Sequence, residues 1–428
     1  MGVEKPGVTA EERAKRAGEL VAVAIREIKS GAAFSESRAC AIFGDVEREY
    51  AGDPDDAVRA NVLLAANYQK VIPDFPRDDS YLADLDGVYR KYGDAEVDGF
   101  RELAVMALDK KICHLENRLK RPEEAIAACD EMVRRYGDDR VDVVRAKVAW
   151  RLKCKRYSLQ DLSRHEEALA VCDEVVRRYG DDRADEVRSC AASALAEKGD
   201  SMREDRPEEA LATYDKVVRR FGDDKAGQVR ARAVNALESK GLFLERLKRH
   251  EEALAVYDEV MKRYGGDGAH EVRAKVAGTM IRKGDALGNL NRPEEAFAVY
   301  DEVVKRYGDD KAANVRHSAA NALSSKAYDL GKLRRYQEQI AVCDELVRRY
   351  GDDQGYGLRE SAALALASKG DALGKLGRVK EAIAAYEEVP KRYDGGMSDW
   401  MREILDSYYT YSNVVINDLI KKWGNPTD

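Results

Sequence analysis

The sequence predicts an all-α fold: an α-solenoid of about nine antiparallel helix pairs, with a capping helix at each end. One phrase recurs at a nearly constant spacing, and two different amphipathic helical patterns alternate along most of the chain. Neither helix of such a pair can bury its apolar face alone, whereas stacked copies form a continuous core. The composition agrees, because 36% charged residues exceeds the roughly 25% of an ordinary globular domain and suits an array with much exposed helix surface.

The recurring phrase reads RHEEALAVCDEVVRRYGDD where it starts at Arg164. Two weaker copies lie upstream and end in Tyr50 and Tyr92, which makes nine predicted units. Successive clear copies are spaced by 43, 42, 43, 43, 43 and 43 residues, and they start at Arg121, Arg164, Arg206, Arg249, Arg292, Arg335 and Arg378.

The phrase itself predicts the second helix of each unit. Its apolar residues recur at helical spacing, and Pro207 stands where the first turn of a helix tolerates a missing N–H. Gly222 and its equivalents are predicted to end the helix in a left-handed conformation. The Asp pair that follows is predicted to cap the first turn of the next helix. The apolar stripe in one copy consists of Ala210, Leu211, Tyr214, Val217, Val218 and Phe221.

A second helical pattern lies between the phrases, as in QVRARAVNALESKGLFLERLKR from Gln228. It predicts a first helix joined to the phrase helix by a short turn. The chain therefore divides into an N-terminal capping helix (1–33), degenerate repeats (34–120), regular repeats of about 43 residues (121–393) and a C-terminal capping helix (394–428).

The stretch KGDALGKLGRVKEAIAAYEEV, from Lys369 to Val389, resembles the tetratricopeptide repeat family. The family unit has 34 residues, so this would be a long-period variant whose first helix is extended at its start. The resemblance implies a right-handed superhelix in which small residues let two helices approach closely. It rests on a small residue late in the first helix (Gly199, Gly241, Gly284, Gly370), a small residue early in the second (Ala210, Ala253, Ala296, Ala382) and a tyrosine four residues later (Tyr214, Tyr257, Tyr300, Tyr386).

The resemblance also implies that the first helices line a concave groove for a peptide or for a helix of another protein. The family's Lys and Asn clamp for a carboxylate does not carry over, because Asp200 and its equivalents stand where the Asn would be. We expect an acidic and partly aromatic groove for a basic or amphipathic segment, and reversing the charge of Asp285 and Asp371 should weaken binding without lowering the melting temperature much. The alternative, that these carboxylates are only solvated helix surface, stays open. The candidate groove residues are Asp200, Asn235, Leu242, Asp285, Asn321, Tyr328 and Asp371.

Features that recur in every copy are expected to serve the fold, whereas features in which copies differ are expected to select a ligand. The repeated arginines from Arg145 to Arg359 lie beside equally repeated Asp pairs, which favours ion pairs between units over a phosphate-binding stripe. The Asp pairs lack the ligand spacing of a calcium loop. Cys129, Cys172 and Cys343 take the tyrosine position of the stripe, which favours core packing over reactivity.

The sequence favours binding over catalysis. No phosphate loop, nucleophile elbow or metal-ligand spacing occurs, so we expect no enzyme activity, metal or cofactor. A net charge of −7 argues against a nucleic-acid partner. The absence of an apolar run and of close-spaced cysteine pairs predicts a cytoplasmic protein without a membrane span. We expect an interaction scaffold or adaptor; the alternative is a sensor that holds and releases a separate effector protein.

Overall fold

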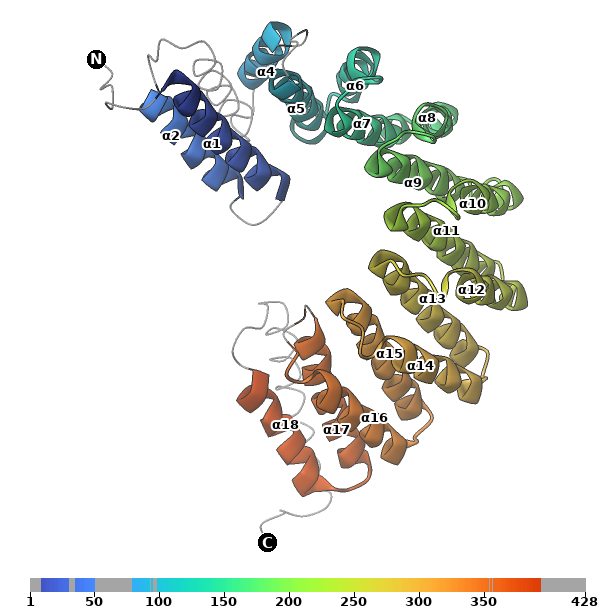
Figure 1. The fold of residues 1–428 in the computed structure, drawn as a ribbon. Helices are drawn as coiled ribbons and strands as arrows, with labels where there is room; N and C mark the ends of the chain where they lie inside the picture. Colours follow the sequence, from blue (N-terminus) through green and yellow to red (C-terminus); the bar gives the residue numbers. More distant parts are fainter. Residues whose placement is uncertain are drawn as a thin grey trace. The chain divides into compact units, whose positions relative to one another are not determined.

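The computed structural model describes residues 9–30, 35–50, 79–92, 94, 98–353, 355 and 357–393. Within these ranges the protein contains 17 α-helices, one π-helical turn and no strand (Figure 1). The chain forms two compact units, Met1–Ser201 and Met202–Asp428. The all-α prediction is thereby confirmed.

In the first unit, α1 packs against α2, and from α4 to α9 each α-helix packs against the next one. Helix α1 packs along α2, so the segment predicted as an N-terminal cap forms a pair with its neighbour; its role as a cap stays a prediction. The elements are α1 (Ala10–Ser30), α2 (Ser35–Tyr50), α4 (Asp79–Tyr92), α5 (Asp98–His114), the π-helical turn η1 (Leu115–Leu119), α6 (Pro122–Tyr136), α7 (Asp142–Asp161), α8 (His165–Tyr179) and α9 (Asp185–Ser201).

The second unit shows the same arrangement with greater regularity. First helices also pack on first helices, α11 on α13, α13 on α15 and α15 on α17, as expected for stacked helix pairs. The predicted C-terminal cap, 394–428, lies outside the described residues, and the handedness of the superhelix stays a prediction. The elements are α10 (Pro207–Phe221), α11 (Gly227–Arg246), α12 (His250–Tyr264), α13 (His270–Asn289), α14 (Pro293–Tyr307), α15 (Ala313–Lys332), α16 (Tyr336–Tyr350), α17 (Leu358–Lys375) and α18 (Val379–Tyr393).

The predicted close approach of the two helices in a pair is present in the second unit. A methyl group added at Gly284 on α13 would overlap the ring of Tyr300 on α14, and Gly241 stands in the same relation to Tyr257. Both tyrosine side chains are buried. The small residue therefore makes room for the aromatic ring of its partner helix.

The glycine after each second helix has a different role from the predicted one. Gly222 and Gly308 have φ angles of −66° and −61°, in the right-handed region, so the prediction of a left-handed stop is wrong. A side chain at Gly222 would instead collide with Arg263 and Tyr264 of the following repeat. Glycine is needed here because the next helix pair packs against the turn.

The left-handed residues lie in the other turn, between the first and second helix of a pair. Non-glycine residues adopt φ angles of 55° to 62° there, which L side chains adopt only at some cost. They are Lys120, Ser163, Lys248, Asn291 and Arg334.

The last aspartate of the turn after a second helix joins one repeat to the next at several turns. Asp310 accepts a hydrogen bond from the N–H of Ala312, just before α15, so it shapes the turn and does not cap the first helical turn as predicted. Its carboxylate also binds the Arg273 guanidinium of the preceding repeat through two bonds of 2.8 and 3.0 Å. The predicted ion pairing between units is thus confirmed, and it recurs as Arg145–Asp182, Arg230–Asp267 and Arg316–Asp353.

This ladder of ion pairs predicts a loss of stability in acid. The arginine hydrogen bonds hold the pKa of Asp267, Asp310 and Asp353 below the usual value of 3.8. A carboxyl with a depressed folded-state pKa contributes stability that is present above its unfolded pKa and is lost as pH falls through the folded value. We expect the melting temperature to decrease once the pH is lowered past about 4. Circular dichroism from about pH 7 to about pH 2.5 measures this decrease.

An Asp310→Asn variant is the matched control, because it removes one titrating group of the ladder and should show a shallower acid dependence. Burial raises the pKa of Asp329 and Asp371, so protonation of these two side chains acts with the opposite sign. A melting temperature that stays level or rises below pH 4 would contradict the ladder's role.

Candidate functional site on the first helices

The predicted groove residues lie on the first helices α9, α11, α13, α15 and α17, and differ in their accessibility. Leu242 and Tyr328 expose 41% and 67% of their surface, which is unusual for large apolar side chains. Asp200 and Asn321 are exposed as well, whereas Asn235, Asp285 and Asp371 are half-buried. Contact with a partner through these residues stays a prediction.

Two of the predicted groove carboxylates hold the core together. Asp285 accepts a hydrogen bond of 2.8 Å from the Tyr300 hydroxyl, and Asp371 accepts one from Tyr386. Reversing either charge would remove the acceptor of a buried hydroxyl. We therefore expect such variants to lower stability as well as any binding.

The same repeat positions carry large aromatic residues on α7, which sequence reasoning missed. Tyr157 corresponds to Leu242 and Tyr328, and Trp150 corresponds to Asn235 and Asn321. On α7, Val143, Trp150 and Tyr157 follow one another at seven-residue spacing. Their side chains are exposed by 44% (Val143), 43% (Trp150) and 51% (Tyr157). The sequence could have revealed these residues, because continuing the predicted groove positions toward the N-terminus in the same repeat register leads to α7. We call Val143, Trp150 and Tyr157 of the first unit, together with Leu242 and Tyr328 of the second unit, the exposed stripe, a name that refers to their repeat positions alone.

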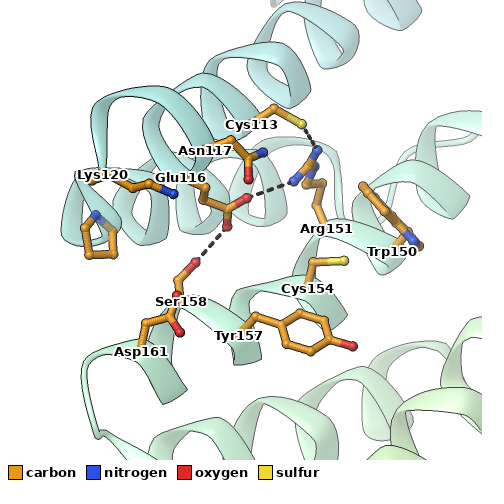
Figure 2. Close-up of a pocket in the computed structure, with 11 residues that line it drawn as sticks. Cys113, Glu116, Asn117, Lys120, Trp150, Arg151, Cys154, Tyr157, Ser158 and Asp161 are labelled. Carbon is orange, nitrogen blue, oxygen red and sulfur yellow. Dashed lines mark hydrogen bonds and ion pairs between the residues drawn. The ribbon is translucent and has the colours of Figure 1, made fainter.

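A cavity of about 490 Å³ opens beside the α7 part of the stripe, between α5, η1, the start of α6 and α7 (Figure 2). This volume is within the range of small-ligand sites. Trp150 and Tyr157 stand on one side of it, with Glu116, Asn117 and Lys120 across from them. The lining residues are Cys113, Glu116, Asn117, Lys120, Pro122, Trp150, Arg151, Cys154, Tyr157, Ser158 and Asp161.

A cluster of charges around the buried Arg151 guanidinium adjoins the cavity, and Arg151 and Glu116 belong to its lining. The Arg151 guanidinium, 3% exposed, donates to Asp109, to the Cys113 sulfur and, at 3.4 Å, to Glu116. Ser158 donates to the other oxygen of Glu116 at 2.7 Å. The Arg151 guanidinium also lies 4.5 Å from the centre of the Trp150 ring. The cluster therefore connects α5 and η1 to α7.

These charges replace apolar residues that the following copies carry. The equivalents of Asp109 and Glu116 are leucine or methionine, for example Leu237 and Leu244, and those of Arg151 are alanine or threonine. All of these equivalents are buried. Buried charges are seldom more stable than a well-packed apolar core, so two adjacent copies that depart from the pattern in this way indicate a function beyond folding.

The environment keeps the arginine charged and the thiols neutral. Burial disfavours the charge of Arg151, but its neighbours, above all Asp109, together outweigh burial and raise the pKa of the guanidinium. Burial raises the pKa of the Cys113 and Cys154 thiols. A ligand in the cavity can thus contact neutral sulfur, two aromatic rings and hydrogen-bonding groups. Among the described residues, no cluster of three or more His, Cys, Asp or Glu side chains is suited to a metal ion.

Family models match three stretches of the chain. Two models, both described as tetratricopeptide repeat, match residues 200–267, and 277–310 together with 363–389. These are tetratricopeptide repeats. The predicted resemblance is confirmed, and repeats of this kind, stacked as helix pairs, provide extended surfaces for protein–protein interaction.

Beyond the tetratricopeptide repeats, the likeness to known proteins is weak. No curated protein matches the chain. The crystal structure of an engineered protein is 15% identical, with 96% of this chain and 97% of that chain covered at a TM-score of 0.39. A structure described by Kap95p binding to RanGDP is 13% identical, with 97% of this chain and 58% of that chain covered at a TM-score of 0.42.

Among the described helices, none combines the length and the apolar character that crossing a bilayer requires.

Proposed function

We propose that this protein is a protein-binding scaffold in which the first helices of each unit receive a basic or amphipathic segment of a partner on their exposed stripe residues. The repeats supply rigid helix pairs, and solenoid arrays of this kind bind through extended faces. Specificity then comes from residues that differ between copies.

The exposed stripe is the observation that carries the proposal. Nine large apolar side chains are exposed among the described residues, and five of them belong to the stripe. Single exposed apolar residues need no explanation, but Tyr157, Leu242 and Tyr328 share one repeat position, and such recurrence is typical of an interaction surface. Trp150, Tyr157 and Tyr328 are also of the types that dominate binding energy at interfaces.

One exposed carboxylate at a stripe position and the negative net charge of the chain favour a partner segment with positive charge. Asp200 is exposed at the position that Tyr157 and Leu242 occupy in neighbouring copies. The chain as a whole has a net charge of −7. A segment with apolar and basic residues on one face would complement both features.

A reducing compartment, the cytoplasm, is part of the proposal. All seven cysteines are thiols, and thiols persist where cellular reductants keep disulfides from forming.

Capture of partners by the tagged full chain tests this function. One variant carries Trp150→Asn and Tyr157→Asp, and a second carries Leu242→Asp and Tyr328→Asp. Both take residues that other copies hold at the same positions, so folding should be preserved. We expect at least one of them to retain less than a tenth of the partner that the wild type captures, which corresponds to about 1.4 kcal/mol.

Lys216→Glu is the matched control, since it changes an exposed residue of a second helix to the residue found in other copies. It should capture the partner as the wild type does. Equal capture by the wild type and both stripe variants would overturn the proposed surface.

A further inference from the structure

Three repeats carry cysteine where the other clear copies carry tyrosine, and this exchange leaves a space between helices. Cys129, Cys172 and Cys343 occupy the positions of Tyr214, Tyr257, Tyr300 and Tyr386. Cysteine has no ring, so each exchange removes the volume of a phenol group from the interior. What fills that volume differs from one repeat to the next.

In the Tyr257, Tyr300 and Tyr386 repeats the phenol ring packs beside the small residue of the first helix and the hydroxyl donates to a carboxylate. The Tyr214 hydroxyl instead accepts a hydrogen bond from Arg203 at 2.7 Å. Tyr257 packs against Gly241 and donates to Glu245 at 2.5 Å. Tyr300 donates to Asp285 at 2.8 Å and, across to the first helix of the next repeat, lies 3.3 Å from Asp329. The phenol site is thus formed by two successive first helices.

The Cys172 repeat fills the same space with an arginine. Arg156 stands where other copies have the small residue. Its guanidinium donates to Glu197 at 2.7 Å, to Gln160 at 3.1 Å and to Ser201 at 3.4 Å. This side chain reaches from its own helix to the next first helix, as the tyrosine hydroxyl does.

The Cys343 repeat fills the space with a glutamine. Gln339 replaces the alanine found in other copies; its amide lies against Gly331 and donates to Ser368 at 3.0 Å. Gly331 and Ser368 are the equivalents of Gln160 and Glu197 in the Cys172 repeat. Two different polar side chains have therefore replaced the phenol at one location in the repeat.

In the Cys129 repeat the corresponding location is the cavity. The residues 43 positions before Arg156, Gln160, Glu197 and Ser201 are Cys113, Asn117, Cys154 and Ser158. All four line the cavity (Figure 2). This location is an open cavity in the Cys129 repeat, whereas a tyrosine, an arginine or a glutamine side chain fills it in other repeats.

We propose that this cavity is a vacant tyrosine site, which receives a tyrosine side chain from the bound partner segment. The inference rests on the proposed function and names one feature of the partner. Trp150 and Tyr157 provide aromatic walls, and the neutral thiols provide favourable sulfur–ring contacts. Glu116 has lone pairs beyond its bonds to Ser158 and Arg151, and accepts the incoming hydroxyl as Glu245 accepts that of Tyr257.

The balance of charge around the cavity favours an uncharged occupant over an ion. Arg151 and Lys147 are matched by Asp109 and Glu116 in the ion-paired cluster. At the mouth, Lys120 and Asp161 also carry opposite charges. A charged side chain would lose hydration in the cavity without gaining an excess of opposite charge there. A phenol hydroxyl, in contrast, needs only one hydrogen-bond acceptor.

Titration of the full chain with p-cresol, the side-chain analogue of tyrosine, tests the site directly. Trp400→Phe and Trp423→Phe leave Trp150 as the single tryptophan, so its emission reports occupancy of the cavity. We expect a saturable change with p-cresol and weaker binding of toluene, which lacks the hydroxyl. Glu116→Leu, the residue type of other copies, should remove this preference.

Two double variants are designed to fill the cavity with residues that other repeats carry at the same location. Cys113→Gly with Cys129→Tyr copies the Tyr300 repeat, and Cys113→Arg with Cys154→Glu copies the Cys172 repeat. Each should weaken p-cresol binding at least tenfold while leaving the melting temperature at or above that of the wild type. The second variant keeps the test decisive if the first folds poorly.

The outcomes separate this inference from the proposed function. No saturable response of the wild type, or unchanged p-cresol affinity in both closed variants, overturns the tyrosine site. Loss of the partner in the stripe variants but full retention in both closed variants also overturns it, while the scaffold function stands. Loss of p-cresol binding and of the partner on closure supports it.

Discussion

Replacing Asp109 with leucine alone is expected to destabilise the first unit by about 3 to 5 kcal/mol. Asp109 is 7% exposed and is the main counter-charge of Arg151, which is 3% exposed. Without it, the guanidinium stays buried, and the anionic partner that the structure shows for it is Glu116 at 3.4 Å, since Cys113 and Trp150 are neutral contacts. Denaturant unfolding followed by circular dichroism and by the emission of Trp150, which packs on Arg151, measures the loss.

The matched control replaces the whole cluster by the residues of other copies: Asp109→Leu, Glu116→Leu and Arg151→Ala. Replacing a buried ion cluster by apolar residues is often neutral or stabilising by about 1 to 4 kcal/mol, so this triple variant should match or exceed the wild type. A triple variant less stable than the single one would mean that the charges serve the fold. Because repeat arrays can unfold with incomplete cooperativity, the two signals are analysed separately.

Gly284→Ala is expected to destabilise the second unit by about 1 to 3 kcal/mol, because the added methyl would overlap the Tyr300 ring between α13 and α14. Gly278 lies on the same helix with no atom near a Cβ placed there. Gly278→Ala should therefore stabilise by about 0.5 to 1 kcal/mol, since alanine is the better helix former. Thermal unfolding of the two variants compares them directly.

The chain also contains the compensation for Gly284→Ala. Ala327 is paired with Cys343 in the next repeat, where Gly284 is paired with Tyr300. Adding Tyr300→Cys to Gly284→Ala should recover part of the lost stability by removing the overlap. If the double variant loses as much unfolding free energy as the two single variants together, the contact between α13 and α14 does not depend on the pairing of these two residues.

The repeat period by itself determined the helix pairs, the small-residue contact and the ion-pair ladder. Each is set by interactions that every copy needs, so repetition in the sequence identified it, as with Arg273 and Asp310. The exposed stripe was available in the same way, because Trp150 and Tyr157 keep the register of Asn235 and Leu242. Only part of it was recognised, since α7 departs from the pattern at several positions at once.

Only the tertiary structure decided which atoms these residues meet. It showed that Asp285 and Asp371 accept core hydrogen bonds, and that the glycine after a second helix makes room for the next repeat. It also showed that Cys113, Asn117, Cys154 and Ser158, from two helices, line a cavity where other repeats place a side chain. Periodicity along one helix predicts which face is buried, but whether the space between two helices is filled depends on side chains that lie about 40 residues apart.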